Sequence, residues 1–561
     1  MATDTIFSDP SVQFLQRLLE SVLKGEIALP RFQRPFVWDK ERRLQLFDSV
    51  RRGIPIGSLM IWETRAPGPD GTEQVFPKTE LGPFELPKVP TSATRRYLLD
   101  GEQRLMTLFF ALHTPREAPE PKGEEPPAAF EAYYDLEAET FEVREDLTEP
   151  LASPTRHFPL RRIFENRGVL RFQRDMEAAI AKEINDSEAF DKKVQTFTER
   201  SDAIAEAFRQ YKIPVTVMAT DDLTLTTETF KRVNSQGVSM SEAHMMNAIS
   251  WQSSFELLKR FDELREDFGD ERYWSSRDNL EDDVLLRVSK RLLDVDVYDE
   301  NVSEIAPKLR SGDVLERVGR SMKRCARFLT DRGLRNPAHM PNIMQLVVLG
   351  VVFDAVPTPS DAALDRLEDW LWFVSYSEVF SRVVRGSTYK HLERQALSLA
   401  RGLSPEAPPR RVVRKPIPRF DFRSARSRAL SWMFARNMMP FDGGKAADAL
   451  ALGGNEAMVR ITSAPRGRSD LASSPAVRVL CDPDHIKNLR GTERYGQFDE
   501  KQRGALVLTD DAIDALRLGP ERDVPRFVEL REKALNDLEQ HRFDEIYDTL
   551  FRDATPAALD D

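Results

Sequence analysis

Cysteine is nearly absent from this chain of 561 residues, which contains only Cys325 and Cys481. Because these two residues are far apart in sequence, we expect neither a disulfide framework nor a cysteine-rich zinc site. Long apolar runs are absent too, since the longest, residues 343–356, is interrupted by Gln345 and Asp354 and is too short to span a bilayer. The first residues lack a basic flank followed by an apolar core, so no signal peptide is predicted. We therefore expect a cytoplasmic protein without a membrane segment.

The sequence also lacks an excess of basic residues and three common functional motifs. Lysine and arginine number 81 against 92 acidic residues, a net charge of −11, so contact with DNA must come from a local basic patch. There is no Gly-x-x-x-x-Gly-Lys-Ser/Thr loop, no Gly-x-Gly-x-x-Gly after a strand and no Gly-x-Ser-x-Gly elbow. A hydrophobic share of 41% with 31% charged residues is ordinary for a globular protein, and the length suits about three domains.

The most informative stretch is residues 97–108, Tyr-Leu-Leu-Asp-Gly-Glu-Gln-Arg-Leu-Met-Thr-Leu. A short apolar strand runs into Asp100-Gly101 and then directly into a helical pattern, which is the geometry of a phosphate-binding turn. Arg104 in the first helical turn is unfavourable beside the positive end of the helix dipole unless an anion lies nearby. The alternative is an ordinary strand-to-helix turn with a surface arginine.

Two further segments accompany this turn. Residues 29–38 read Leu-Pro-Arg-Phe-Gln-Arg-Pro-Phe-Val-Trp and precede a Pro-Ile-Gly strand at residues 53–62, and residues 229–242 contain Phe-Lys-Arg-Val-Asn-Ser-Gln-Gly. In this order the segments resemble the N-terminal domain of GmrSD-type modification-dependent restriction enzymes, a relative of the ParB and sulfiredoxin fold. The family pattern is Phe-Gln-Arg-x-aromatic-x-Trp, Pro-Ile-Gly, Asp-Gly-Gln-Gln-Arg-Leu-x-Thr-Leu and Phe-x-Arg-x-Asn-x-x-Gly. The resemblance covers roughly residues 10 to 250.

The resemblance implies that the domain binds and hydrolyses GTP, ATP or CTP with Mg²⁺ or another divalent metal. It implies a nucleotide site that comprises Gln33, Arg34, Gly101, Gln103, Arg104, Thr107, Arg232 and Asn234. Asp100 or Glu102 would position the metal. Glu102 departs from the family, which has Gln there, so it either helps to hold Mg²⁺ or weakens the site by repelling phosphates. ParB-like boxes carry Gly-Glu-x-Arg at this place, which favours a working site.

The role of the Asn234 loop stays open at the level of sequence. If the fold places this loop over the Asp100 turn, Arg232 and Asn234 contact a base, ribose or phosphate. The alternative is an asparagine that only holds its own turn through side-chain to backbone bonds. Ser239 and Glu242 have capping-box spacing, which predicts that a helix begins there.

Periodicity predicts an α+β N-terminal domain over residues 1–250, a mainly helical domain over 251–405, and a small α+β end over 406–561. Helical spacing predicts a first helix that includes Val12 through Leu23 and a second over residues 39–52. Residues 130–143 resemble a strand pair, the run to about residue 210 reads as charged helices, and residues 211–218 as a strand.

A basic segment opens the predicted third domain in an otherwise acidic chain. Its members are Arg410, Arg411, Arg414, Lys415, Arg419, Arg423, Arg426 and Arg428, against only Asp421. Clustered cations neutralise phosphates well, so these residues form the best candidate DNA-backbone patch. The alternative is an interdomain linker that contacts acidic helices.

Residues 481–486, Cys-Asp-Pro-Asp-His-Ile, resemble the opening of an HNH nuclease motif. In such a motif His485 would activate water while Asp484 helps to hold one divalent metal at the scissile phosphate. The family's His-His-Ile-Phe-Pro is not intact here, and the downstream asparagine is missing. Active cleavage and a degenerate, metal-poor version therefore both remain open.

Two classes of function follow. The first is a type IV-like restriction protein of phage defence that hydrolyses NTP and acts on DNA, including modified phage DNA, with cleavage by the C-terminal region or by a partner nuclease subunit. The second is a non-cleaving, ParB-like module that uses NTP to switch its grip on DNA or on a partner, including a further copy of itself. The retained N-terminal motifs favour the first class, and the missing HNH asparagine favours the second.

Overall fold

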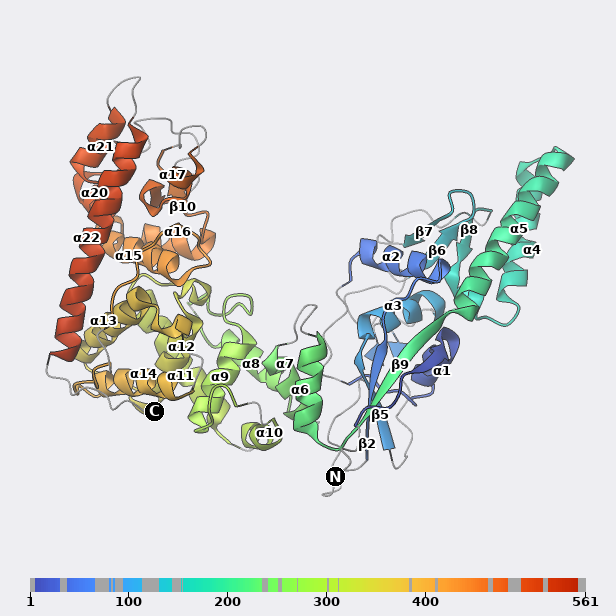
Figure 1. Cartoon of the computed structure of the whole chain (residues 1–561), viewed down its shortest axis with the longest axis horizontal. Coiled ribbons are helices and arrows are strands. Elements are labelled where there is room, and N and C mark those ends of the chain that lie inside the picture. Colours follow the sequence, from blue (N-terminus) through green and yellow to red (C-terminus); the bar gives the residue numbers. More distant parts are fainter. Residues whose placement is uncertain are drawn as a thin grey trace. The chain divides into compact units, whose positions relative to one another are not determined.

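The computed structural model describes residues 6–30, 38–65, 80–81, 84–85, 94–113, 131–143, 153, 155–234, 241–250, 255–269, 271–299, 302–310, 312–382, 386–408, 412–462, 468–482, 496–517 and 523–552. The chain divides into two compact units, residues 1–253 with 301–303 and residues 254–300 with 304–561. Figure 1 colours both units along the sequence.

A mixed four-stranded sheet lies at the centre of the first unit (Figure 1). In spatial order its strands are β1 (Ser11–Phe14), β9 (Lys212–Ala219), β2 (Leu59–Arg65) and β5 (Thr94–Asp100). β9 runs parallel to β2 and antiparallel to β1, while β2 and β5 are antiparallel. Ile213 and Val215 of β9 and Ile61 of β2 are buried in one continuous core with the surrounding helices, so the sheet is a firm base for the loops at its ends.

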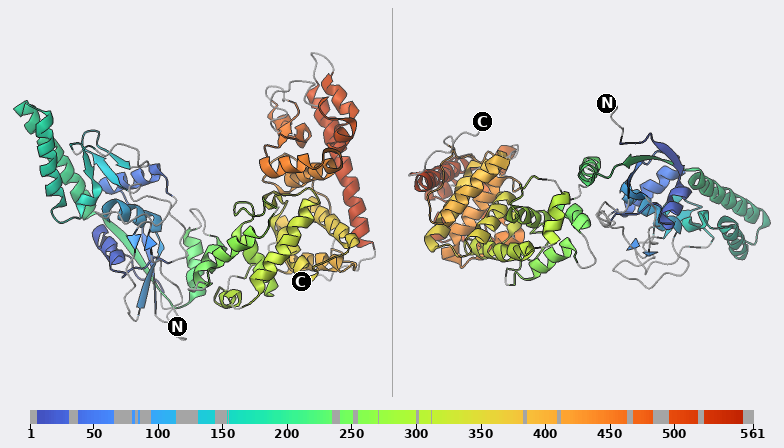
Figure 2. Two further views of the ribbon diagram at one scale, coloured as in Figure 1. Left: turned by 180° about the vertical axis from the view of Figure 1, so that it is seen from behind. Right: turned by 90° about the horizontal axis from the view of Figure 1, so that it is seen from below.

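Seven helices belong to this unit: α1 (Leu15–Leu23), α2 (Lys40–Arg51), α3 (Glu102–His113), α4 (Gly168–Glu183), α5 (Ser187–Gln210), α6 (Leu223–Asn234) and α7 (Glu242–Ser250) among the described residues. α4 and α5 pack side by side and extend away from the sheets (Figures 1 and 2). These two helices confirm the charged helices predicted up to about residue 210.

A second, three-stranded sheet has the order β7-β6-β8. It comprises β6 (Ala132–Asp135), β7 (Thr140–Val143) and β8 (His157–Pro159), followed by a 3₁₀ turn at Leu160–Ile163. The β6–β7 hairpin confirms the strand pair predicted at residues 130–143, and β9 confirms the strand predicted at 211–218. A short hairpin of β3 (Glu80–Leu81) and β4 (Phe84–Glu85) completes the described strands of this unit.

The structure corrects the predicted start of the first helix. Val12 lies in β1, not in a helix, and α1 begins only at Leu15. Residues 11–14 pair with β9, so backbone bonds to a neighbouring strand override the helical spacing of the apolar side chains. The helix predicted near residue 242 does begin there, and Ser241 Oγ accepts from the backbone N–H of His244, whereas Ser239 lies outside the described residues.

The second unit is built mostly of helices. They are α8 (Leu257–Glu266), α9 (Asp282–Leu292), α10 (Val302–Arg310), α11 (Val314–Thr330), α12 (Ile343–Ala355), α13 (Asp361–Ser377), α14 (Gly386–Ala400), α15 (Ala425–Asp442), α16 (Lys445–Gly453), α17 (Ser469–Ser473), α20 (Glu500–Ala505), α21 (Asp510–Arg517) and α22 (Val524–Phe551). Three 3₁₀ turns lie at Pro337–His339, Val379–Arg382 and Pro475–Val477, and β10 (Met458–Arg460) pairs with β11 (Arg478–Leu480).

Packing crosses the domain boundary predicted at residue 405, which falls inside this second unit. Trp372 of α13 stacks on Trp432 of α15 with ring centroids 4.0 Å apart. The long helix α22 lies along α13 (Figure 1), and its buried Arg531 donates hydrogen bonds to the carbonyls of Ala476, Leu506 and Val507. The Trp372–Trp432 stack and the packing of α22 on α13 join the C-terminal elements to the helical part, and the bonds of Arg531 join the C-terminal elements to one another.

The chain is an α+β protein, as the sequence predicts. Most of the apolar run at residues 343–356 forms helix α12, in which nine of the 13 residues are buried. No helix among the described residues combines the length and the apolar character needed to cross a bilayer.

Candidate functional site

The strand-to-helix turn at Asp100 has the geometry predicted from the sequence. β5 ends at Asp100, Gly101 takes a φ of +92°, and α3 starts at Glu102. The backbone N–H of Leu105 donates to the carbonyl of Gly101 at 2.9 Å, so the helix is hydrogen-bonded from the glycine onward. The positive end of the helix dipole therefore lies directly at the turn.

A β-bulge precedes the turn. Met60 lies opposite Asp100 and Ile61 lies opposite Leu98, so Leu99 is an extra residue in β5. Bulges bend a strand and re-aim its side chains, and they are common beside functional sites. Here the bulge sets the direction in which Asp100 leaves the sheet.

Arg104 connects this turn to the loop before β2. Its Nη2 donates to Asp100 Oδ2 at 2.8 Å, and its Nη1 donates to the carbonyl of Ile56 at 2.8 Å. Two glycines with positive φ, Gly57 at +89° and Gly101 at +92°, leave room for the guanidinium. A Cβ on Gly57 would approach Nη1 to 2.4 Å, and one on Gly101 would approach Nη2 to 3.2 Å. The anion that the sequence argument requires beside Arg104 is thus the carboxylate of Asp100.

The turn remains accessible to solvent. The side chains of Arg104 and Asp100 are 17% and 29% exposed, and Gly57 and Ser58 are exposed beside them. A guanidinium, a carboxylate and the first N–H groups of a helix meet at this point. This combination can hold an anion at the helix start and a cation at the carboxylate.

Three predicted residues of α3 are buried. Glu102, Gln103 and Thr107 are 3%, 7% and 2% exposed, and the Thr107 hydroxyl donates to the Gln103 carbonyl at 2.7 Å. The side chain of Thr107 thus supports the first turn of α3 by bonding to the backbone of Gln103. Gln33 and Arg34 lie outside the described residues.

The predicted residues of the Asn234 loop come from the end of α6, a helix that packs against β5. Arg232 is highly exposed and forms an ion pair with Glu228 one turn earlier. The side chain of Asn234 and residues 235–240 lie outside the described part of the chain. Contact between this loop and the Asp100 turn stays a prediction.

Three arginines of the basic segment have partners inside the protein. Arg414 and Arg426 both donate to Glu539 Oε2, at 2.9 and 2.5 Å. Arg428 donates to the carbonyls of Phe422 and Met340. The side chains of Arg414 and Arg426 are only 8% and 3% exposed, so neither is accessible to a DNA backbone. This fits the alternative of a segment that contacts acidic helices.

The other described residues of the basic segment differ in their exposure to solvent. Arg419 is exposed, Arg423 is exposed but paired with Asp421, and Lys415 is half-buried. Arg410 and Arg411 lie outside the described residues. A DNA contact through Lys415, Arg419 and Arg423 stays a prediction.

The HNH-like residues Asp484 and His485 also lie outside the described residues. Asp482 and Gln497, on either side of the undescribed segment, line a cavity of about 840 Å³ in the second unit. Charged residues of α15 and α16 contribute to the same wall: Asp442, Lys445 and Asp448.

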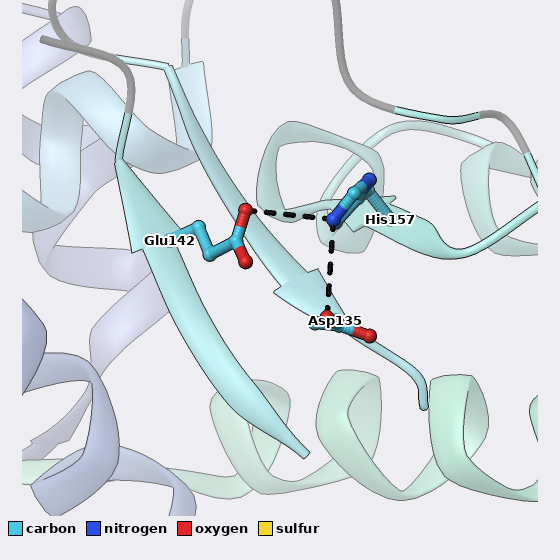
Figure 3. Close-up of side chains that lie close together, drawn as sticks. All are labelled: Asp135, Glu142 and His157. Carbon is cyan, nitrogen blue, oxygen red and sulfur yellow. Dashed lines mark ion pairs between the residues drawn. The ribbon is translucent and has the colours of Figure 1, made fainter. Parts of the chain in front are cut away.

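The first unit also contains a cluster of charged side chains that no sequence motif predicts. Asp135 of β6, Glu142 of β7 and His157 of β8 bring their oxygen and nitrogen atoms within 4.8 Å of one another (Figure 3). These residues are widely spaced in the chain and follow no ligand motif, so only strand pairing brings them together. Asp135 also accepts from Arg156 Nε at 2.6 Å.

The hydrogen bonds of this cluster indicate a structural network and not a metal site. The backbone N–H of Ser153 donates to His157 Nδ1 at 2.9 Å, so the neutral ring carries its proton on Nε2. That Nε2 faces Glu142 at 3.4 Å and Asp135 at 3.9 Å (Figure 3). A protonated Nε2 is a donor to carboxylates and has no lone pair for a metal.

The fold and the turn define the first unit as an α+β domain with a strand-to-helix junction at which Asp100 and Arg104 form an ion pair. Residues 15–251 match the family of the GmrSD restriction endonuclease N-terminal domain, and this part of the chain belongs to that family. The match confirms the resemblance to the GmrSD N-terminal domain that the motifs indicate. It does not extend to residues 252–561.

A second comparison concerns a shorter stretch. Over 99 residues, 18% of the chain, the sequence is 35% identical to an uncharacterized protein of Methanocaldococcus jannaschii. The match spans only 16% of that protein's length.

Alanine at Gly101 tests the geometry of the turn, and alanine at Gly53, a glycine with positive φ that follows α2, is the matched control. We expect Gly53→Ala, where φ is +67° and nothing lies within 4 Å of the added Cβ, to lower the free energy of unfolding by about 1 kcal/mol. Gly101→Ala should cost at least about 1 kcal/mol more, because its Cβ would lie 2.1 Å from the buried Leu59 side chain. Urea denaturation measures both, and equal losses would contradict the close packing of the turn.

Asp135→Asn tests the His157 network. Burial alone would raise the pKa of Asp135, but hydrogen bonds from Arg156 and from the backbone of Ala138 and Glu137 lower it to about 2. Because this pKa lies below that of the unfolded chain, the carboxylate stabilises the fold above about pH 4 and loses that effect as the pH falls towards 2.

We therefore expect Asp135→Asn to melt below the wild type at pH 7 and the difference to shrink between pH 4 and 2. Glu142→Gln is the matched control, because Glu142 is half-exposed and should change the melting temperature little. A difference that does not vary with pH would show that the Asp135 charge contributes nothing.

Proposed function

We propose that this chain is a restriction protein of phage defence that binds and hydrolyses a nucleoside triphosphate and acts on DNA with modified bases. One observation carries the proposal: the Asp-Gly turn with Arg104 at its centre lies inside the region that matches the N-terminal domain of a restriction endonuclease family. The proposal covers GTP, ATP and CTP alike.

Phosphate binding would rest on the start of α3. An anion at a helix N-terminus accepts backbone N–H bonds and gains from the dipole. Arg104 uses one N–H of each Nη for Ile56 and Asp100, which leaves its other donors for phosphate oxygens. Gln33 and Arg34 would supply further contacts, and Arg232 and Asn234 would approach from the end of α6.

A divalent cation would bind at Asp100, with Glu102 as the second carboxylate. The donor set fits Mg²⁺, which prefers carboxylate oxygens together with substrate phosphates. Arg104 occupies Oδ2 of Asp100, so Oδ1 is the oxygen offered to the cation. Bound Mg²⁺ would neutralise charge on the nucleotide phosphates.

The action on DNA would lie in the second unit. Lys415, Arg419 and Arg423 are proposed to contact the DNA backbone. Asp484 and His485 would form the nuclease site, with Asp484 as a metal ligand and His485 as the base that activates water. A partner nuclease subunit is the alternative source of cleavage.

The second candidate function is a non-cleaving, ParB-like nucleotide switch that controls binding to DNA or to another protein. The missing HNH asparagine favours this alternative, and so does the pairing of Arg414 and Arg426 with Glu539, which reduces the DNA patch. The two candidates share the nucleotide site and differ only in whether DNA is cut.

NTP hydrolysis and DNA cleavage measured side by side separate the two candidates. We expect Arg104→Ala to reduce Mg²⁺-dependent hydrolysis by about 100-fold, because it removes both a phosphate donor and the bond to Asp100. His485→Ala should keep hydrolysis and lose cleavage of phage DNA with modified bases on a gel. Arg174→Ala, an exposed arginine of α4, is the matched control.

Wild-type hydrolysis without cleavage would instead support the nucleotide switch or a nuclease that lies on a partner subunit. Full hydrolysis by Arg104→Ala would contradict the proposed role of the Asp100 turn in both candidates.

A further inference from the structure

Tyr211 holds the loop that carries the carbonyl partner of Arg104. It lies between α5 and β9 and is only 7% exposed. Its hydroxyl donates to the carbonyl of Ile54 at 2.6 Å and accepts from the backbone N–H of Ile56 at 3.2 Å. One oxygen thus fixes both ends of the Ile54-Pro55-Ile56 segment.

The bonds continue from this segment to the turn. Ile56 uses its N–H for Tyr211 and its carbonyl for Arg104 Nη1. Arg104 in turn holds Asp100 through Nη2. Tyr211, Ile56, Arg104 and Asp100 therefore form one hydrogen-bonded chain from the start of β9 to the start of α3.

At Gly57 the backbone of the loop lies directly against Arg104, so a small shift of the loop would disturb this series of hydrogen bonds. The Gly57 φ of +89° brings the backbone so close to the guanidinium that even a Cβ would lie 2.4 Å from Nη1. Without the bonds from Tyr211, the segment at residues 54–56 would shift relative to Arg104, and the orientation of the guanidinium would no longer be fixed.

We propose that Tyr211 is a positioning residue for the Asp100 turn, which acts through Ile56 to hold Arg104 in the orientation that binds phosphate. This inference rests on the proposed nucleotide-binding function. Tyr211 does not touch the phosphate itself, because its hydroxyl is already used by two backbone groups. Burial raises the pKa of Tyr211 above its ordinary value of 10.0, so the hydroxyl remains protonated as a donor at neutral pH.

Tyr211→Phe in the full chain tests the inference, because it removes only the hydroxyl. Tyr134→Phe is the matched control: Tyr134 is 2% exposed, lies in the same unit, and interacts with Arg51 and not with the turn. Binding of GTP, ATP and CTP with Mg²⁺ is measured by calorimetry, and thermal unfolding and amide hydrogen exchange are measured on the same samples.

We expect Tyr211→Phe to weaken binding about fivefold to tenfold, and Tyr134→Phe to leave it within twofold, at similar losses of melting temperature. Hydrogen exchange at residues 54–58 and 100–105 should rise in Tyr211→Phe alone. Unchanged binding in a Tyr211→Phe protein that is folded would overturn the inference.

The exchange measurement separates failure of this inference from failure of the proposed function. If the wild type binds none of the three nucleotides, the proposed function fails, and exchange alone decides whether Tyr211 positions the turn. Unchanged exchange at residues 100–105 in Tyr211→Phe would then overturn the positioning role.

Discussion

The ion pair between Arg104 and Asp100 is the interaction on which the rest of the candidate site depends. A guanidinium at the first turn of a helix is unfavourable beside the dipole, and the neighbouring carboxylate removes that penalty. Charge-assisted hydrogen bonds of this kind contribute about 1.5–3 kcal/mol each when they are partly buried. The pair also holds the guanidinium of Arg104 at the turn, so the local stability of α3 and the shape of the site have the same origin.

The same pair constrains what the turn can bind. Because Asp100 neutralises Arg104, the attraction for phosphate comes mainly from the N–H groups at the start of α3 and from further cations. A nucleoside triphosphate carries several negative charges, so we infer that its binding needs Mg²⁺ at Asp100 or additional arginines such as Arg34. With such a cation present, the carboxylate of Asp100 beside the start of α3 is compatible with the proposed function.

Much of the first unit follows from local sequence signals. Asp100-Gly101 marks a strand end, a positive φ and a helix start, and all three are found. The bond from Arg104 to the Ile56 carbonyl could not be predicted from a local pattern, because Ile56 lies in a loop 48 residues earlier in the chain. Val12 was placed in the wrong element since its pairing with β9 involves residues about 200 positions later.

The basic segment illustrates the same limit of local reasoning. A row of arginines in an acidic chain indicates a DNA patch only as long as their partners are unknown. Glu539 lies 113 residues after Arg426 and takes up both Arg426 and Arg414. The cluster of Asp135, Glu142 and His157 is likewise created by strand pairing, and its proton positions follow from the Ser153 backbone. In each case a distant residue, invisible in a linear pattern, decides the role of the side chain.

Under the proposed function, the Asp100 turn and the loop before β2 form the nucleotide site. Amide hydrogen exchange of the wild-type chain, measured with and without Mg²⁺ and each of GTP, ATP and CTP, examines both segments at once. We expect one nucleotide to slow exchange at residues 54–58 and 100–105 more than elsewhere. Slower exchange confined to other segments, with these two unchanged, would contradict it.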